Sequence, residues 1–282
     1  MSGKNRTIYY PDNCLKKGFF STYRNIVDEI IGNRWLIFQL LKRELLSLYK
    51  QSFIGILWAF VLPLISVGTF FFLNQSGVFV QKASNIPYSV FAVFGVALWQ
   101  VFSSGVIAGS ASLVKAGPMI VKINFSKKSL VIASVLQSLI AFFAQVIFLI
   151  ILFLAIGYDP GPDILLIIVF VIPVLFLALG LSFILSMVNG IMRDIGNVIP
   201  VFVTFLMFLT PVLYYKPDGG ILKVISQVNP LYYLISFPRD MVLFGVYSEW
   251  KGYVFSVLFS IIFLSISVMV FHVTESRVAE RI

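Results

Sequence analysis

The sequence predicts an all-α polytopic membrane protein with six membrane-spanning helices. Of its 282 residues, 59% are hydrophobic and only 12% are charged, whereas an average soluble domain carries roughly 25% charged residues. The charges are also segregated, because long charge-free runs alternate with short charged stretches. Lipid is therefore expected to be the solvent for most of the chain.

Residues 1–50 are expected to form a cytoplasmic tail followed by an N-terminal amphipathic interface helix. Over residues 23–50, apolar side chains recur at helical spacing and charged side chains occupy the other faces. A break in this helix is expected near Gly32 and Asn33. The segment is too charged to span a membrane, so it should lie in the membrane interface.

Residues 51–282 are expected to form one six-span transmembrane domain. Each expected span has the approximately 20 apolar residues that a crossing helix needs. The spans are residues 52–73, 86–113, 129–157, 164–188, 196–215 and 252–273. The apolar stretch 224–238 is shorter and contains Asn229, Pro230 and Pro238. It is expected to form short re-entrant or interfacial helices between the fifth and sixth spans.

The distribution of lysine and arginine predicts that both ends of the chain lie in the cytoplasm. With the N-terminus inside, sixteen basic residues fall in cytoplasmic segments and five fall outside, as the positive-inside rule requires. We therefore expect a multi-pass protein of the cytoplasmic (inner) membrane.

Several kinds of chemistry lack the residues they usually need. The sequence has no G-x-x-x-x-G-K-[ST] loop for ATP, and no acidic residue lies deep in a span to couple transport to an ion. Cys14 and His272 are the single cysteine and the single histidine, so neither a metal site nor a catalytic residue is expected. The basic residues behind the net charge of +9 flank the spans and form no nucleic-acid patch. We expect no cofactor on this chain and no nucleic-acid partner.

The loop between the second and third expected spans, residues 114–128, has two interpretations. Pro118 can begin a short helix after Gly117, and apolar side chains on that helix could dock a partner protein. These apolar residues are Met119, Ile120, Val121 and Ile123. The alternative is a helix on the lipid surface, anchored by Lys115, Lys122, Lys127 and Lys128.

The fifth expected span carries aromatic side chains at regular spacing. Phe202, Phe205 and Phe208 recur every three residues between Pro200 and Pro211. They either pack in the protein core or line a path for sugars, since ring faces bind the apolar faces of sugars.

Four motifs together resemble the membrane subunits of type-2 ABC exporters, and specifically the permeases that export O-antigen, capsule and teichoic acid polymers. The first is Tyr-Lys-x-Ser-x-x-Gly-x-Leu-Trp-x-x-x-x-Pro-Leu at 49–64. The others are Arg-Asp-Ile at 193–195, Pro-Val-x-Tyr at 211–214 and Asn-Pro-Leu at 229–231. The resemblance covers the chain from about residue 35 to its end.

The resemblance implies partners and sites that composition does not reveal. It implies a permease homodimer with two ATP-binding cassette subunits, with ATP and Mg²⁺ on those partners. It implies an ATPase-coupling helix at Gly117, Pro118, Met119, Ile120, Lys122 and Ile123. The implied substrate channel contains Trp58, Phe72, Phe202, Phe205, Phe208 and Tyr214. The implied external gate spans about residues 221–243 and contains Asn229, Pro230, Tyr232, Tyr233 and Arg239.

The expected function is that of a permease subunit of an ATP-driven exporter of lipid-linked, O-antigen-like polysaccharide; its other partners would be membrane lipid and this substrate. Lys42, Arg43 and Lys50, beside the first span, could attract the lipid pyrophosphate or serve as ordinary positive-inside anchors. One alternative is a permease for teichoic acid, a drug or a small lipid. Another is a membrane-bound polyprenyl-lipid transferase, which would need acidic residues gathered at one membrane face.

Overall fold

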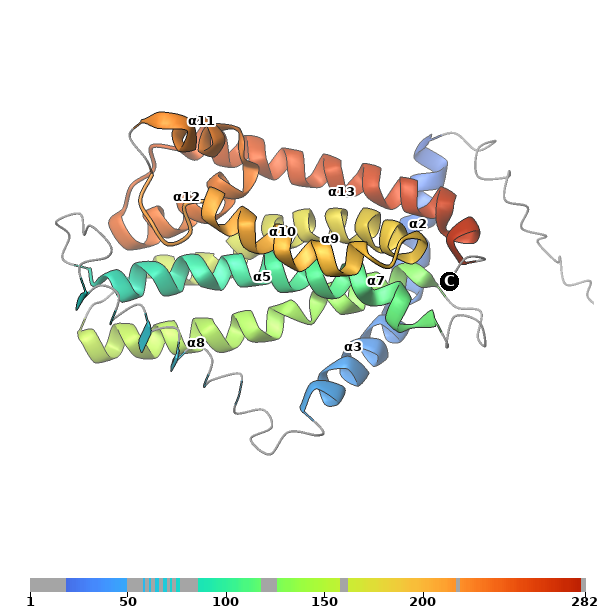
Figure 1. The fold of residues 1–282 in the computed structure, drawn as a ribbon, viewed down its shortest axis with the longest axis horizontal. Coiled ribbons are helices and arrows are strands. Elements are labelled where there is room, and N and C mark those ends of the chain that lie inside the picture. Colours follow the sequence, from blue (N-terminus) through green and yellow to red (C-terminus); the bar gives the residue numbers. More distant parts are fainter. Residues whose placement is uncertain are drawn as a thin grey trace, which may run out of the picture.

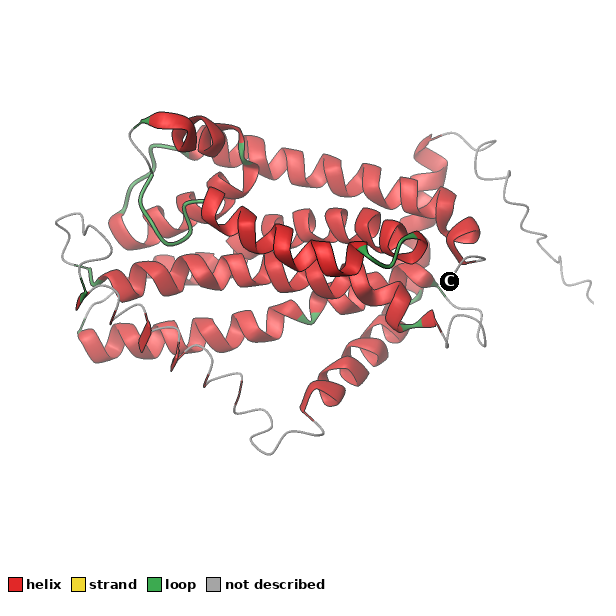
Figure 2. Cartoon of the chain, viewed as in Figure 1, coloured by secondary structure: helices red, strands yellow, loops and turns green. Residues whose placement is uncertain are grey.

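The computed structural model describes residues 19–49, 86–117, 126–157, 162–216 and 219–279, together with isolated positions between 58 and 76. Within these ranges every regular element is a helix (Figure 2). The long helices lie side by side as a bundle, and the first two helices cross one end of it (Figure 1). The described residues therefore agree with the predicted all-α class.

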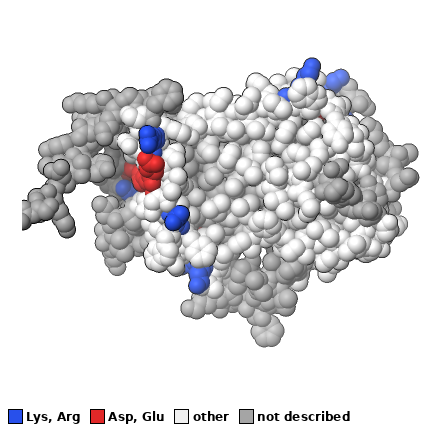
Figure 3. All heavy atoms as spheres, turned by 180° about the vertical axis from the view of Figure 1, so that it is seen from behind, with Lys and Arg blue, Asp and Glu red and all other residues white. Residues whose placement is uncertain are grey.

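Four helical segments are long and apolar enough to cross a membrane. They are Tyr88–Lys115, Lys127–Ala155, Ile164–Ile191 and Trp250–Glu275. They correspond to the second, third, fourth and sixth expected spans. On the face that Figure 3 shows, charged side chains gather toward the two ends and the band between them is free of charge. This distribution is the one that a lipid environment requires.

Helix α5 (Tyr88–Lys115) lies at the centre of the bundle. Its many buried residues pack against α9 (Ile167–Ile191) and against the pair α7 (Lys127–Leu136) and α8 (Ser138–Ile156). Small residues allow the close approach of α5 to α9, because a Cβ atom at Gly109 would overlap the side chain of Ser182. A short 3₁₀ helix, η2 (Pro162–Leu166), leads into α9. Helix α13 (Trp250–Ala279) covers the other side of α9.

The fifth expected span differs from its prediction at the C-terminal end. Helix α10 (Ile195–Leu209) has 15 residues, or about 22 Å of helix, which is less than the approximately 30 Å of a hydrocarbon core. The expected range 196–215 was therefore too long. The helix ends because Thr210 precedes Pro211 and takes an extended conformation, as residues before proline do.

The first expected span, 52–73, lies almost entirely outside the described residues. Only isolated positions such as Trp58 and Phe72 are described within it, and both are helical. The described residues thus identify four candidate spans. Six spans with both ends in the cytoplasm remain a prediction.

The N-terminal segment contains two helices, α2 (Phe19–Gly32) and α3 (Arg34–Tyr49). They meet at Asn33, whose side-chain amide donates to the backbone carbonyl of Glu29 over 2.9 Å. The break falls where the sequence placed it. Helix α3 packs against α7, and the position of the two helices in the membrane interface remains a prediction.

Two short helices lie at the opposite end of the bundle from α2 (Figure 1). They are α11 (Gly220–Val228) and α12 (Pro230–Phe244), and Asn229 separates them. The Asn229 side chain accepts from the Leu231 amide over 3.0 Å, and Pro230 occupies the first helical position. Both features start a helix. The helical pair occupies the stretch between α10 and α13 where the sequence predicted it.

Candidate functional site

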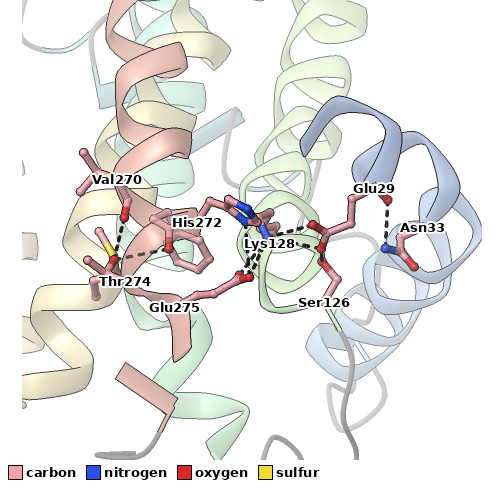
Figure 4. Close-up of polar contacts among 10 residues, drawn as sticks. Glu29, Asn33, Ser126, Lys128, Val270, His272, Thr274 and Glu275 are labelled. Carbon is pink, nitrogen blue, oxygen red and sulfur yellow. Dashed lines mark hydrogen bonds and ion pairs between the residues drawn. The ribbon is translucent and has the colours of Figure 1, made fainter. Parts of the chain in front are cut away.

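A buried lysine joins three helices at the end of the bundle that carries α2. The ammonium nitrogen of Lys128 lies 3.0 Å from a Glu29 carboxylate oxygen and 2.8 Å from a Glu275 carboxylate oxygen. The Lys128 side chain is 0% exposed. Figure 4 shows Glu29 reaching it from α2 and Glu275 from α13. We call Glu29, Ser126, Lys128 and Glu275 the Lys128 cluster.

The first turn of α7 positions this cluster. Ser126 precedes α7 at the N-cap position, yet its hydroxyl makes no capping bond. It donates to a Glu29 carboxylate oxygen over 2.8 Å instead. Glu29 thus accepts hydrogen bonds from two residues of the same turn, and its negative charge lies near the positive end of the α7 dipole.

The structure corrects the lipid-anchor interpretation of Lys128. A lysine that anchors a helix to headgroups keeps its ammonium group in water or among phosphates, whereas Lys128 is buried in ion pairs. Of the predicted coupling helix, Gly117 is described, and it is buried two residues after the last residue of α5. The other predicted coupling residues lie outside the described residues: Pro118, Met119, Ile120, Lys122 and Ile123.

A second buried cation lies at the other end of the bundle. The Arg239 side chain is 1% exposed, and its Nη1 donates to the carbonyls of Pro211 and Val212 over 3.0 and 3.2 Å. Its Nε pairs with Asp240 over 3.0 Å, and its guanidinium lies 3.8 Å from the ring centre of Phe91. We call these five residues the Arg239 cluster. It fastens α12 to the turn that ends α10 and to α5.

Three further contacts hold the same turn. The Tyr88 hydroxyl donates to the Leu213 carbonyl over 2.6 Å, and the Asn229 amide donates to the Thr210 hydroxyl over 2.9 Å. A Cβ atom at Gly95 would lie 2.5 Å from the Val212 carbonyl oxygen. Glycine is therefore needed for α5 to approach this turn so closely. Of the predicted gate residues, the structure brings Asn229 and Arg239 together on one turn.

The two predicted gate tyrosines, Tyr232 and Tyr233, face the start of α13. Tyr232 is buried, and burial together with a hydrogen bond to Glu249 raises the pKa of its phenol. Glu249 also pairs with Lys216. Tyr233 lies against the start of α13, where a Cβ atom at Gly252 would overlap its ring.

The predicted channel residues of α10 share one exposed face. Phe202, Phe205 and Phe208 are 59%, 59% and 64% exposed, so they are not core residues of the described chain. Val198 and Val201 extend the same face. Trp58 and Phe72 are exposed as well. Tyr214 differs, because it is half-buried and its hydroxyl donates to the Phe208 carbonyl over 2.8 Å.

The predicted pyrophosphate residues Lys42 and Arg43 are both exposed on α3. Lys50 lies outside the described residues. Among the residues that the structure describes, no group of three or more His, Cys, Asp or Glu side chains is placed to hold a metal ion.

Sequence reasoning missed the partnership of Glu29, Lys128 and Glu275. The hydrogen-bonded pairs are 99 and 147 residues apart in the chain, so no local pattern connects them. The available signal was weaker: Lys128 begins an apolar span with no nearby acidic residue in sequence. The helix dipole disfavours a lysine in the first turn of a helix, so this position predicts that carboxylates lie near the lysine in the folded protein.

The apolar helices and their charged ends define a multi-pass helical membrane protein. The chain matches the ABC-2 type transporter family over residues 36–243. It is 30% identical over 214 residues to the O-antigen export system permease protein RfbA of Myxococcus xanthus, covering 75% of this chain and 81% of the relative. It is 24% identical over 255 residues to a Klebsiella pneumoniae protein of the same name, covering 87% of this chain and 94% of the relative.

The chain therefore belongs to the ABC-2 type transporter family, as its four motifs predicted. Members of this family are membrane subunits of transporters.

Proposed function

We propose that this chain is the permease subunit of an ATP-driven exporter that moves lipid-linked polysaccharide of the O-antigen type across the cytoplasmic membrane. The observation that carries the proposal is the match to relatives named O-antigen export system permease proteins, which extends over most of both chains. The permease performs no covalent chemistry in this proposal. It supplies the path, and the sugar chain passes through it.

The energy comes from a separate ATPase in this proposal, because the sequence has no phosphate-binding loop. Two copies of the permease pair with two ATP-binding cassette subunits, which bind ATP and Mg²⁺. With six spans and both ends inside, the Lys128 cluster faces the cytoplasm and the Arg239 cluster faces the outside. The segment 117–126, which ends at Ser126 of the Lys128 cluster, docks on the ATPase.

The exposed face of α10 supports the assignment of a sugar path. The described chain leaves Phe202, Phe205 and Phe208 uncovered, so their rings are available to contact lipid or a sugar chain. In the assembled exporter they line the channel together with Trp58, Phe72 and Tyr214. Their flat faces hold the apolar faces of successive sugars without a fixed register, which a polymer in transit requires.

The two ends of this path have separate roles in the proposal. Lys42, Arg43 and Lys50 attract the lipid pyrophosphate to a lateral entrance beside the first span, since phosphates favour lysine and arginine. The Arg239 cluster, with Asn229, Pro230, Tyr232 and Tyr233, forms the external gate. The Arg239 contacts to the Pro211 and Val212 carbonyls hold the C-terminal end of α10 to that gate.

Co-purification tests the assembly. A tagged permease should retain an ATPase that carries a phosphate-binding loop and is encoded beside it. Ile120→Asp and Ile123→Asp should each weaken this retention, because a buried carboxylate would oppose apolar docking. Val224→Asp, on an exposed face of α11 at the other end of the bundle, is the matched control. A permease that transports without any ATPase would contradict the proposal.

A further inference from the structure

Lys128 connects three segments that lie far apart in the chain. We infer that Lys128 is a positioning residue, which ties the base of the ATPase-docking segment to α2 and α13 so that all three move together. The inference rests on the proposed function, because it assigns the route by which movement at the docked ATPase reaches the spans.

Lys128 bonds closely to both of its partners, Glu29 of α2 and Glu275 of α13. Lys128 Nζ lies 3.3 and 3.0 Å from the two Glu29 carboxylate oxygens and 2.8 and 3.0 Å from those of Glu275. Hydrogen bonds of this length weaken steeply when stretched. A shift of the first turn of α7 by an ångström or so therefore breaks these bonds unless α2 and α13 follow.

Burial makes separation of the charges unfavourable. The Lys128 side chain is 0% exposed, so an ammonium group without its carboxylates would lose both water and counter-charge. The carboxylates also offset the unfavourable position of a lysine at a helix N-terminus. The three segments are therefore expected to stay joined while the docking segment moves.

Further contacts extend the tie into the bundle. On one side, Ser134 of α7 donates to a Glu44 carboxylate oxygen over 2.8 Å, which fastens α3 to the same helix. On the other side, Thr274 contacts the sulfur atom of Met187 in α9 over 2.6 Å, one residue before Glu275. Movement at Ser126 is thus conveyed to the N-terminal helices and to two spans.

Three variants separate positioning from mere stabilisation. Lys128→Met breaks the tie and leaves two carboxylates facing each other. The triple variant Glu29→Gln, Lys128→Met, Glu275→Gln also breaks the charge tie but leaves no uncompensated charge, so its stability should recover. Lys128→Arg keeps the positive charge, and the planar guanidinium group of arginine can donate hydrogen bonds to two carboxylates. Lys127→Met, on the neighbouring lysine for which no ion pair is found in the described chain, is the matched control.

Two readouts decide the inference. In the purified permease alone, backbone amides of α2 should exchange hydrogen at least about tenfold faster in Lys128→Met and in the triple variant than in the control. In the reconstituted exporter, both variants should continue to hydrolyse ATP but export less polymer per ATP. Lys128→Arg should restore most of both values.

Unchanged exchange in α2, or a stable triple variant with full export per ATP, would overturn the inference. Should Lys128→Met fail to fold, the triple variant alone decides. A failure of the proposed function has a different signature, namely the absence of ATP-driven export by the unaltered chain. In that case the exchange measurement still decides whether Lys128 joins α2 to α7.

Discussion

The ammonium nitrogen of Lys128 lies 2.8 Å from a carboxylate oxygen of Glu275, although 147 residues separate the two in the chain. This contact joins the start of one candidate span to the end of the last one. Apolar burial cannot account for it, because both groups are charged. The contact gives a fixed geometry to the end of the bundle at which the ATPase is proposed to dock.

Lys128→Met should lower the free energy of unfolding by about 3 kcal/mol, since removing one partner of a buried ion pair leaves uncompensated charge. The value is set at the low end because Glu29 and Glu275 keep part of their surface exposed. Denaturant unfolding of the detergent-solubilised permease measures it. Lys127→Met should change stability by less than about 0.5 kcal/mol, and equal losses in both variants would argue against the cluster.

Arg239→Lys should destabilise the turn that follows α10, although the substitution keeps the positive charge. A lysine cannot donate to the Pro211 and Val212 carbonyls while stacking on Phe91, because it lacks the planar fork of arginine. The loss should reach about 1–3 kcal/mol for the carbonyls left without a partner. Thermal unfolding measures it, with the exposed Arg193 changed to lysine as the control. Wild-type stability in Arg239→Lys would show that the cluster is not needed in this form.

Gly95→Ala should push the turn at residues 210–213 away from α5. The new Cβ atom would lie 2.5 Å from the Val212 carbonyl oxygen, so backbone must move, at a cost of roughly 1–3 kcal/mol. Gly32→Ala is the matched control, because nothing lies within 4 Å of a Cβ atom there. Circular-dichroism melting compares the two variants, and a Gly95→Ala protein as stable as Gly32→Ala would refute the close approach.

Phe205→Ala and Trp58→Ala should reduce polymer export while leaving assembly with the ATPase intact. Both rings are exposed, so their removal costs little packing. Phe102→Ala is the contrasting change, because Phe102 is buried in α5 and its loss should cost about 3–5 kcal/mol of stability. Surface polysaccharide and co-purified ATPase are measured together. Normal export in both exposed-ring variants would mean that these rings do not line the path.

The helical class and the larger spans were predictable from the sequence because lipid imposes one rule on them. A charge-free run of sufficient length must form a helix in lipid, and α5, α9 and α13 lie within a few residues of their predicted ranges apart from a longer C-terminal end in α13. The break at Asn33 and the pair α11 and α12 followed from local glycine, asparagine and proline signals.

The end of α10 and the Lys128 cluster were not predictable in the same way. Residues 210–215 are apolar enough to continue a span, and their actual turn is held by Arg239, Tyr88 and Asn229. These partners are distant in sequence, so hydropathy does not reveal them. The carboxylate partners of Lys128 are also distant in sequence, and the positive-inside rule counts Lys128 only as a basic loop residue.

The exposed face of α10 was predictable in part. The spacing grouped Phe202, Phe205 and Phe208 on one helix face, but only the structure shows that the described chain leaves this face uncovered.

ATP-driven transfer in a reconstituted membrane tests the central proposal most directly. Proteoliposomes would contain this chain with its neighbouring ATPase, and labelled lipid-linked polysaccharide would be supplied on the ATPase side. ATP should move the polymer into the lumen, and an ATPase variant lacking its ATP-binding lysine should abolish the movement. Equal movement without ATP, or no movement of polysaccharide while another lipid is transported, would contradict the proposal.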